Sequence, residues 1–186
     1  LNRKGAWLET ISGVRFYPAD PRPEEVSIED IAHSLSRQCR FGGHVREHYS
    51  VAQHCVLVSK NVPPEDSLKG LLHDAAEAYV VDLPSPVKWI LREASNARGV
   101  LNPYDAIEAL VWDAISERFA ISNVLPASVK TADMRALFTE RRDLRPITAH
   151  LWEDQANYDP FPDRIVSMSC EEARVAFLRR FEEVIS

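Results

Sequence analysis

Apolar residues recur at helical spacing along most of the chain. In "IEDIAHSL" (residues 28–35) they stand three or four positions apart, which is the spacing of a helix with one buried face. Ser27 precedes this run and Asp30 follows three residues later, an arrangement similar to a capping box at a helix start. We therefore expect a first helix that begins at about residue 28.

The same spacing predicts further helices, with prolines between them. The expected ranges are residues 50–60, one continuous helix over 65–80, a short helix from Ser85, a longer helix from Asn102, residues 126–143 and a final helix from Ser169. Ser85 is a good N-cap residue before Pro86, and a proline in the first turn favours the starts at Ser85-Pro86 and Asn102-Pro103. The expected core face of the longer helix comprises Ile107, Leu110, Val111, Ala114 and Ile115.

Two regions depart from the helical pattern. Residues 7–17, "WLETISGVRFY", predict two short strands around a Ser12-Gly13 turn, and a proline-rich connector follows them. Residues 145–168 contain three prolines and no sustained period, which indicates a long ordered loop. We predict an all-α fold, a helical bundle with a short N-terminal β-hairpin. It forms one domain made of residues 1–26 (hairpin and connector), 27–144 (helical core) and 145–186 (loop and final helix).

Composition narrows the classes of function. The chain of 186 residues is 45% apolar and 27% charged, and its net charge is −6. A negative net charge argues against binding of a nucleic-acid polymer or an anionic membrane. No apolar run approaches the roughly 20 residues that span a bilayer, and the first 13 residues lack the apolar core of a secretory signal. The three cysteines are widely spaced, so we expect a reduced, cytoplasmic protein.

Four titratable residues stand within apolar faces of three predicted helices: His54, His73, Asp74 and Asp133. Burying an unpaired carboxylate is costly, so such residues need a partner or a cation. One divalent ion would satisfy all four and leave positions open for water and substrate. Neighbouring helical residues diverge by about 100°, so the His73-Asp74 pair alone is also typical of a solvated surface. The four residues in combination favour a metal site.

The order His54, His73-Asp74, Asp133 resembles the H…HD…D motif of the HD-domain family of metal-dependent phosphohydrolases. The segments "SVAQHCVLVS", "LLHDAAEAYVVDLPSPVK" and "VKTAD" are similar to the corresponding segments of bacterial 5′-deoxynucleotidases and related phage nucleotide phosphohydrolases. The resemblance covers about residues 28–144. It implies an HD-domain bundle and one divalent ion (Mn²⁺, Co²⁺, Fe²⁺, Zn²⁺ or Mg²⁺) held by these four residues.

The resemblance also implies an activity. A metal-activated water would remove the 5′-phosphate from a deoxyribonucleoside monophosphate. Asp74 would take part in catalysis as a metal ligand, and Glu77, on the same side of the helix, would act as general acid or base. Arg40 looks like the phosphate-binding arginine of the family. Phe41 would form a wall of the base pocket, and Asp82 would bind the deoxyribose 3′-OH.

Several alternatives stay open at this point. Lys88 and Arg46 compete with Arg40 as the substrate-binding cation, and His44 and His48 compete with His54 as first ligand. The same site would serve a dNTP phosphohydrolase or a non-catalytic nucleotide-binding module. The four residues could also be core residues without an ion. Apolar positions on the helix after Asn102 and on the final helix lead us to expect a homodimer.

Overall fold

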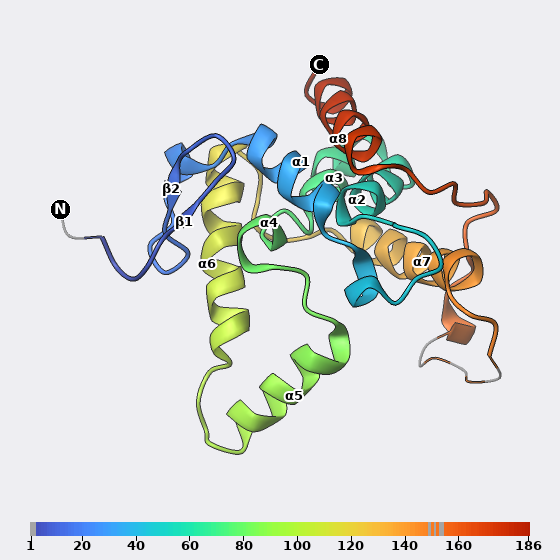
Figure 1. Ribbon diagram of the computed structural model, residues 1–186, viewed down its shortest axis with the longest axis horizontal. Helices are drawn as coiled ribbons and strands as arrows, with labels where there is room; N and C mark the ends of the chain where they lie inside the picture. The colour runs from blue at the N-terminus through green and yellow to red at the C-terminus, as the bar shows by residue number, and fades with distance from the viewer. Residues whose placement is uncertain (1–2, 149, 151, 153–154) are drawn as a thin grey trace.

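The computed structural model describes residues 3–148, 150, 152 and 155–186. It is mostly helical (Figure 1), and its two strands, β1 (Leu8–Glu9) and β2 (Arg15–Phe16), form an antiparallel hairpin near the N-terminus. The α-helices in chain order are α1 (Ile28–Arg37), α2 (Val51–Lys60), α3 (Ser67–Leu72), α4 (Glu77–Val80), α5 (Ser85–Asn96), α6 (Pro103–Arg118), α7 (Ala127–Leu144) and α8 (Cys170–Ile185). The all-α prediction and the N-terminal hairpin are confirmed.

The helix starts follow the capping residues of the sequence. Ser27, Ser50 and Ser169 accept hydrogen bonds from backbone N–H groups in the first turns of α1, α2 and α8, which satisfies donors that a helix start leaves free. Only Ser169 forms the full capping box. The capping-box prediction for α1 is half right, because the Asp30 carboxylate bonds Ser12 in the hairpin turn instead of returning to Ser27. Asp30 thereby ties the hairpin to α1.

Helix α2 lies at the centre of the packing. It packs against α3, α8, α1 and α7, and two apolar clusters meet on it. The larger cluster joins α2 to α1, α3, α6 and α8, while the smaller one joins Val58 of α2 to α7 and Phe161. Gly70 lets α3 approach closely, because a Cβ there would lie 3.1 Å from Ser59 Cα.

The continuous helix expected over residues 65–80 is wrong. The structure has a 3₁₀ turn at Pro64–Asp66, then α3, a turn at 73–76 and the short helix α4. The turn has tighter bonding than an α-helix, since Ala75 N–H donates to Leu72 O and Glu77 N–H donates to Asp74 O, each three residues back. His73 and Asp74 therefore lie at a bend between two helices.

Two smaller expectations also need correction. Leu110 was placed on the core face of α6, yet 46% of it is exposed, because the apolar stripe of α6 is wider than the part that the core covers. Ser85 does not cap α5, which begins at Ser85 itself after Pro84.

The segment expected to be a loop, residues 145–168, has a single 3₁₀ turn at Gln155–Asn157 in its described part. Residues 149, 151, 153 and 154 lie outside the described residues.

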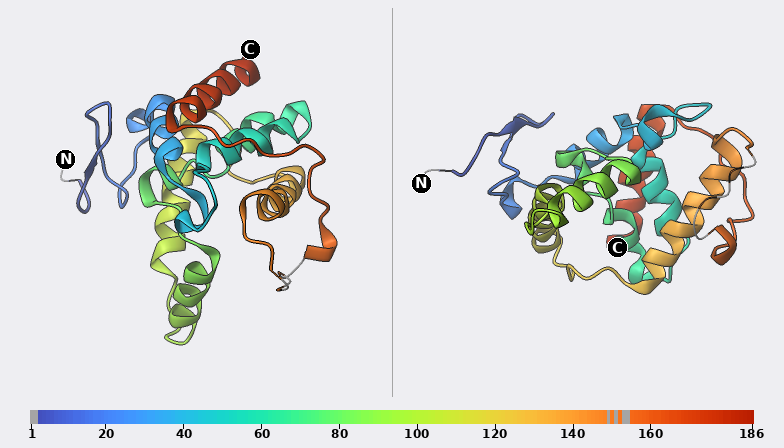
Figure 2. Two further views of the ribbon diagram at one scale, coloured as in Figure 1. Left: turned by 45° about the vertical axis from the view of Figure 1, so that its right-hand side comes forward. Right: turned by 90° about the horizontal axis from the view of Figure 1, so that it is seen from below.

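Helix α5 stands apart from the rest of the bundle. In Figure 1 and in the left view of Figure 2 it projects away from α1, α2, α3 and α8, beyond the end of α6. In the described part of the chain, none of the helices combines the length and the apolar character that crossing a membrane requires.

Candidate metal centre

Two histidines and a carboxylate converge where α2 faces the bend between α3 and α4. His54 Nε2 lies 3.2 Å from His73 Nε2, and Asp74 Oδ2 lies 3.5 Å from the first nitrogen and 3.3 Å from the second. His54 is fully buried. One ligand atom from each of the three residues lies within 4.8 Å of the others, so this cluster could hold a metal ion.

Asp133 on α7 adjoins this cluster. Its Oδ1 lies 3.1 Å from His54 Nε2 and 3.9 Å from His73 Nε2. It is not part of the compact group of three, and its side chain is 40% exposed. All four residues singled out in the sequence are therefore neighbours, three of them tightly grouped.

Hydrogen bonds at the far side of each ring orient the two histidines. His54 Nδ1 lies 2.6 Å from Glu140 Oε1, and His73 Nδ1 lies 2.9 Å from Gly70 O. A carboxylate and a carbonyl oxygen both accept, so each Nδ1 carries the proton and donates it. Each Nε2 then faces the cluster and binds a metal through its lone pair once its own proton has left, as in histidines that bind metals. Two imidazole nitrogens and two carboxylates at one point call for a cation, which is a proton or a metal ion.

The spacing suits a divalent ion. Neighbouring ligand atoms at about 2.0–2.2 Å from one ion lie about 2.8–3.6 Å from each other when the coordination is tetrahedral or octahedral. The three separations among His54, His73 and Asp74 and the 3.1 Å from His54 Nε2 to Asp133 Oδ1 fall in this range, and the 3.9 Å between His73 and Asp133 is slightly longer. A set of two imidazole nitrogens and carboxylate oxygens accepts several first-row divalent ions.

The charges of the cluster shift its pKa values. Burial lowers the pKa of His73, but the Asp74 carboxylate raises it more, so the net pKa lies well above the ordinary value. Burial raises the pKa of Asp74, but both histidines and Arg40 lower it more, so this carboxyl stays ionised. In the metal-free protein the protonated His73 ring and the Arg40 guanidinium thus balance the carboxylate charge, and a metal ion takes the place of the proton when it binds.

Arg40 lies beside the cluster. Its Nη1 is 3.5 Å from Asp74 Oδ2, and its Nε donates to Glu140 Oε2 over 3.2 Å. Arg40 follows α1 in a short turn in which Phe41 has a φ of 58°, a left-handed conformation that costs a residue with a Cβ roughly 1–2 kcal/mol. The Phe41 ring lies 6.1 Å from the Trp152 ring and 5.3 Å from the Arg145 guanidinium.

Glu77 is a buried acid at the start of α4. Its Oε1 lies 3.3 Å from Lys88 Nζ, and within the described residues its buried Oε2 has no hydrogen-bond partner. Burial, together with the charges of Asp74 and Asp82, raises the pKa of Glu77 to about 9. Lys88 also pairs with Glu108 over 3.1 Å, so its ammonium is already engaged by two acidic side chains.

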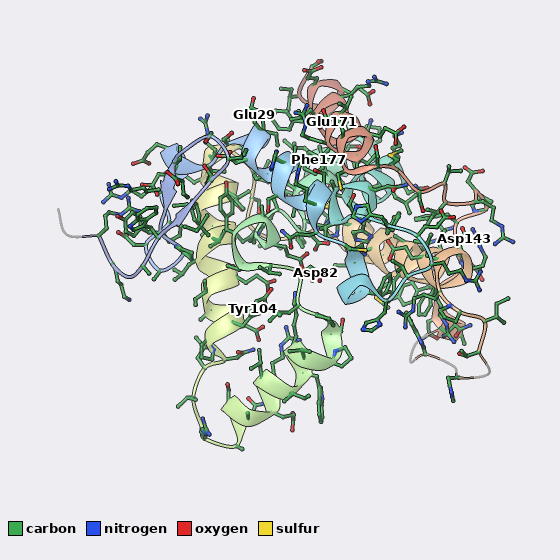
Figure 3. All side chains as sticks on the ribbon, viewed as in Figure 1. Glu29, Asp82, Tyr104, Asp143, Glu171 and Phe177 are labelled. Carbon is green, nitrogen blue, oxygen red and sulfur yellow. The ribbon has the colours of Figure 1, made fainter. Side chains whose placement is uncertain are left out.

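Asp82 follows α4 on the segment that leads to α5 (Figure 3). Burial raises its pKa, and the charge of Arg40 lowers it in part. Gln38, which the sequence did not single out, fixes this segment: its amide donates to Glu77 O over 2.9 Å and its oxygen accepts from Asp82 N–H over 3.0 Å. No local sequence signal marks this residue.

The remaining candidates lie elsewhere. Among the described residues, neither His44 nor His48 belongs to the ligand cluster. His44 is exposed in the turn after Phe41, and His48 Nε2 lies 3.4 Å from Ser36 O. Arg46 is exposed.

Sequence reasoning also missed Glu140, whose carboxylate is fully buried against His54 and Arg40. It stands in "TERRD", which looks like a solvated charged run. One feature of the sequence could have identified it. Glu140 follows Asp133 by seven residues, or about two helical turns, so both residues lie on the same side of α7.

Comparison with known proteins finds relatives in two bacteria. No family model matches the chain. Over 147 residues the chain is 40% identical to the uncharacterized protein YfdR of Escherichia coli (strain K12), a match that covers 79% of this chain and 77% of that protein. An uncharacterized protein of Rhodobacter capsulatus is 36% identical over 138 residues, which cover 69% of this chain and 66% of that protein. Neither name states a ligand or a reaction, so function has to be argued from the site.

Proposed function

This chain belongs to the family of Escherichia coli YfdR, and we propose that it is a metal-dependent phosphohydrolase of the HD-domain type. Its substrate in this proposal is a deoxyribonucleoside 5′-monophosphate, from which water removes the phosphate. One observation carries the proposal: a guanidinium adjoins the ligand cluster, with Arg40 Nη1 3.5 Å from Asp74 Oδ2. A phosphate monoester suits such a place, because its oxygens bind a metal ion and an arginine at the same time.

His54, His73, Asp74 and Asp133 would hold one divalent ion, which would be Mn²⁺, Co²⁺, Fe²⁺, Zn²⁺ or Mg²⁺ according to supply. When bound, the ion lowers the pKa of a coordinated water and screens negative charge on the phosphoryl oxygens. The close grouping of donor atoms from His54, His73 and Asp74, the neighbouring Asp133, and the orientation of both Nε2 atoms toward the cluster support this part of the proposal.

The other residues bind the substrate and move a proton. Arg40 offers its Nη groups to the phosphate, since its Nε is occupied by Glu140. With a pKa of about 9, Glu77 is protonated at neutral pH and donates its proton to the leaving 5′-oxygen as a general acid. Asp82 accepts a hydrogen bond from the 3′-OH, and the Phe41 ring forms one wall of the base pocket.

A substrate panel tests the proposal. The metal-free protein is loaded with Mn²⁺ and given dNMPs, NMPs and dNTPs, and orthophosphate and triphosphate are measured. We expect orthophosphate from dNMPs. Asp74→Asn should lower this rate by about 10³-fold or more, because a catalytic ion supplies several kcal/mol. The control Asp105→Asn removes a carboxylate that pairs with Arg92, outside the cluster, and should leave the rate unchanged.

Each other outcome points to a different function. Triphosphate from dNTPs without orthophosphate from dNMPs would replace the proposed substrate by dNTPs. Nucleotide binding without hydrolysis would favour a non-catalytic module. Hydrolysis that survives Asp74→Asn would remove the catalytic role of the cluster.

The homodimer and the cytoplasmic location stay predictions. Exposed apolar side chains on α6 and α8, such as Leu110 and Ile185, support a self-association surface in this proposal. Light scattering of the purified protein would measure the subunit number.

A further inference from the structure

We propose that Glu140 is a positioning residue. Through the two oxygens of its carboxylate it holds the metal ligand His54 and the phosphate-binding Arg40 at a fixed distance and orientation relative to each other. This inference rests on the proposed function, because it assigns Glu140 a role toward the same ion and the same phosphate. Glu140 itself touches neither of them in this scheme.

The geometry gives each oxygen of Glu140 its own partner. Oε1 lies 2.6 Å from His54 Nδ1, and Oε2 accepts from Arg40 Nε over 3.2 Å. The Glu140 side chain is 0% exposed, so both bonds form away from bulk water, where charge-assisted hydrogen bonds are strongest. A buried carboxylate is costly unless it is paired, and here both of its partners belong to the candidate site.

The bond to His54 fixes the face of the ring that meets the ion. With Nδ1–H donating to Glu140, Nε2 faces the cluster and lies 3.1 Å from Asp133 Oδ1 and 3.2 Å from His73 Nε2. Partners of this kind set the tautomer and the ring orientation of metal-binding histidines. Without Glu140 the His54 ring would be free to present Nε2–H, which cannot bind a metal.

The bond to Arg40 fixes which donors remain for substrate. Because Glu140 accepts from Nε, the guanidinium is held with Nη1 3.5 Å from Asp74 and its remaining N–H groups are available to an anion. A guanidinium has five donors in a rigid fork, so anchoring one of them orients the others. One carboxylate therefore determines the distance between the place of the ion and the place of the phosphate.

A purely structural role makes a different prediction. Asp143 provides the comparison, since it lies on the same helix, three residues further on (Figure 3), with a side chain only 5% exposed and paired with Arg142 and Arg164. If Glu140 only stabilised α7, removing either charge would lower the melting temperature without changing ligand affinity. A positioning role changes affinity in the Glu140 variants alone.

The experiment compares Glu140→Ala, Glu140→Gln and Asp143→Asn with the wild type. Mn²⁺ affinity of metal-free protein and inorganic phosphate affinity of Mn²⁺-loaded protein are measured by calorimetry, and melting temperatures are measured alongside. Glu140→Ala should weaken Mn²⁺ binding about 10–100-fold and phosphate binding as well. Glu140→Gln can satisfy only one partner, because an amide has one acceptor, so it should weaken at least one of the two affinities about tenfold. Asp143→Asn should change neither.

Affinities of both Glu140 variants within twofold of the wild type would overturn the inference, as would an equal loss in Asp143→Asn. If the variants do not fold, the wild type decides: nitrogen NMR of Zn²⁺-loaded protein should show His54 with Nδ1–H, and a His54 with Nε2–H would overturn it. A wild type that binds no divalent ion contradicts the proposed function, whereas normal binding with unaffected Glu140 variants contradicts only the role of Glu140.

Discussion

Helices α2 and α5 have similar lengths, but they are held in place differently. Eight of the ten residues of α2 are buried, among them His54. In α5, Ser95 alone of the twelve residues is buried, and Trp89 and Ile90 are 62% and 58% exposed. A helix that is apolar on every side is held by the core, whereas α5 depends on a few polar contacts.

Those contacts are ion pairs and hydrogen bonds. Lys88 of α5 lies between Glu77 and Glu108, Arg92 pairs with Asp105, and Tyr104 of α6 donates to Val81 O just before α5. The α2 side of the candidate site, which carries His54, and the α5 side, which carries Lys88, therefore differ in stability. The metal ligands share the stability of the whole fold, while Lys88, which pairs with the proposed general acid, sits on a helix that can open locally at low cost.

The strongest way to test this comparison is to truncate one apolar side chain on each side. Leu72→Ala removes a fully buried residue that adjoins His73 and should cost about 2–5 kcal/mol of unfolding free energy. Ile90→Ala on α5 should cost no more than about 0.5 kcal/mol. Urea unfolding of metal-free protein measures both. An equal cost for Ile90→Ala would show that α5 is covered in solution, and dependence on protein concentration would identify a second copy as the cover.

A second test concerns Glu77, where the two sides meet. Its folded pKa is about 9 and its ordinary value is 4.5. Between these values the folded state keeps a proton that the unfolded state has lost, so the free energy of unfolding of metal-free protein should fall as pH rises from about 5 to about 9. Glutamine does not titrate. Glu77→Gln should therefore gain stability relative to the wild type as pH rises through this range, by roughly 1.4 kcal/mol for each pH unit above the ordinary pKa.

Thermal melts in chelator at a series of pH values measure this difference. Glu108→Gln is the matched control, because it removes the other carboxylate partner of Lys88 and should keep the wild-type slope. A slope that is the same in Glu77→Gln and in the wild type would show that Glu77 is ionised in the folded protein.

The same contrast explains what the sequence could and could not predict. His54, His73, Asp74 and Asp133 were found because each is a polar residue inside an apolar helical pattern, and such patterns report burial. Glu140 is fully buried, but it precedes Arg141, Arg142 and Asp143, so its neighbours in sequence conceal its environment. Its partners are 86 and 100 residues away, and no local pattern reports such pairings.

The helix boundaries over residues 65–80 and the buried face of α6 were predicted wrongly for a related reason. The apolar spacing continues through residues 65–80, so it predicts one helix, whereas the bend at 73–76 is built from backbone bonds three residues back that leave no mark on side-chain periodicity. Leu110 lies on the apolar stripe of α6, yet it is 46% exposed. Periodicity indicates which face of a helix is apolar, but the packing of distant elements decides how much of that face is covered.

The smallest expected effect on stability is that of releasing α5. Lys88→Met removes the ion pair with Glu108 and the hydrogen bond to the protonated Glu77 carboxyl, and it keeps most of the apolar stem. A partly exposed ion pair of this kind contributes about 1 kcal/mol or less. Global stability should therefore change little, while amide hydrogens of α5 should exchange faster than in the wild type, because local opening becomes easier. Exchange in α2 should not change, since its amides open only with the whole fold.

The control Arg92→Gln breaks a pair in which the arginine side chain is 52% exposed and should have a weaker effect on the amides of α5. Unchanged exchange in α5 after Lys88→Met would mean that contacts other than those of Lys88 hold the helix. The two helices would then differ in how far their side chains are exposed, but not in their dependence on these polar contacts.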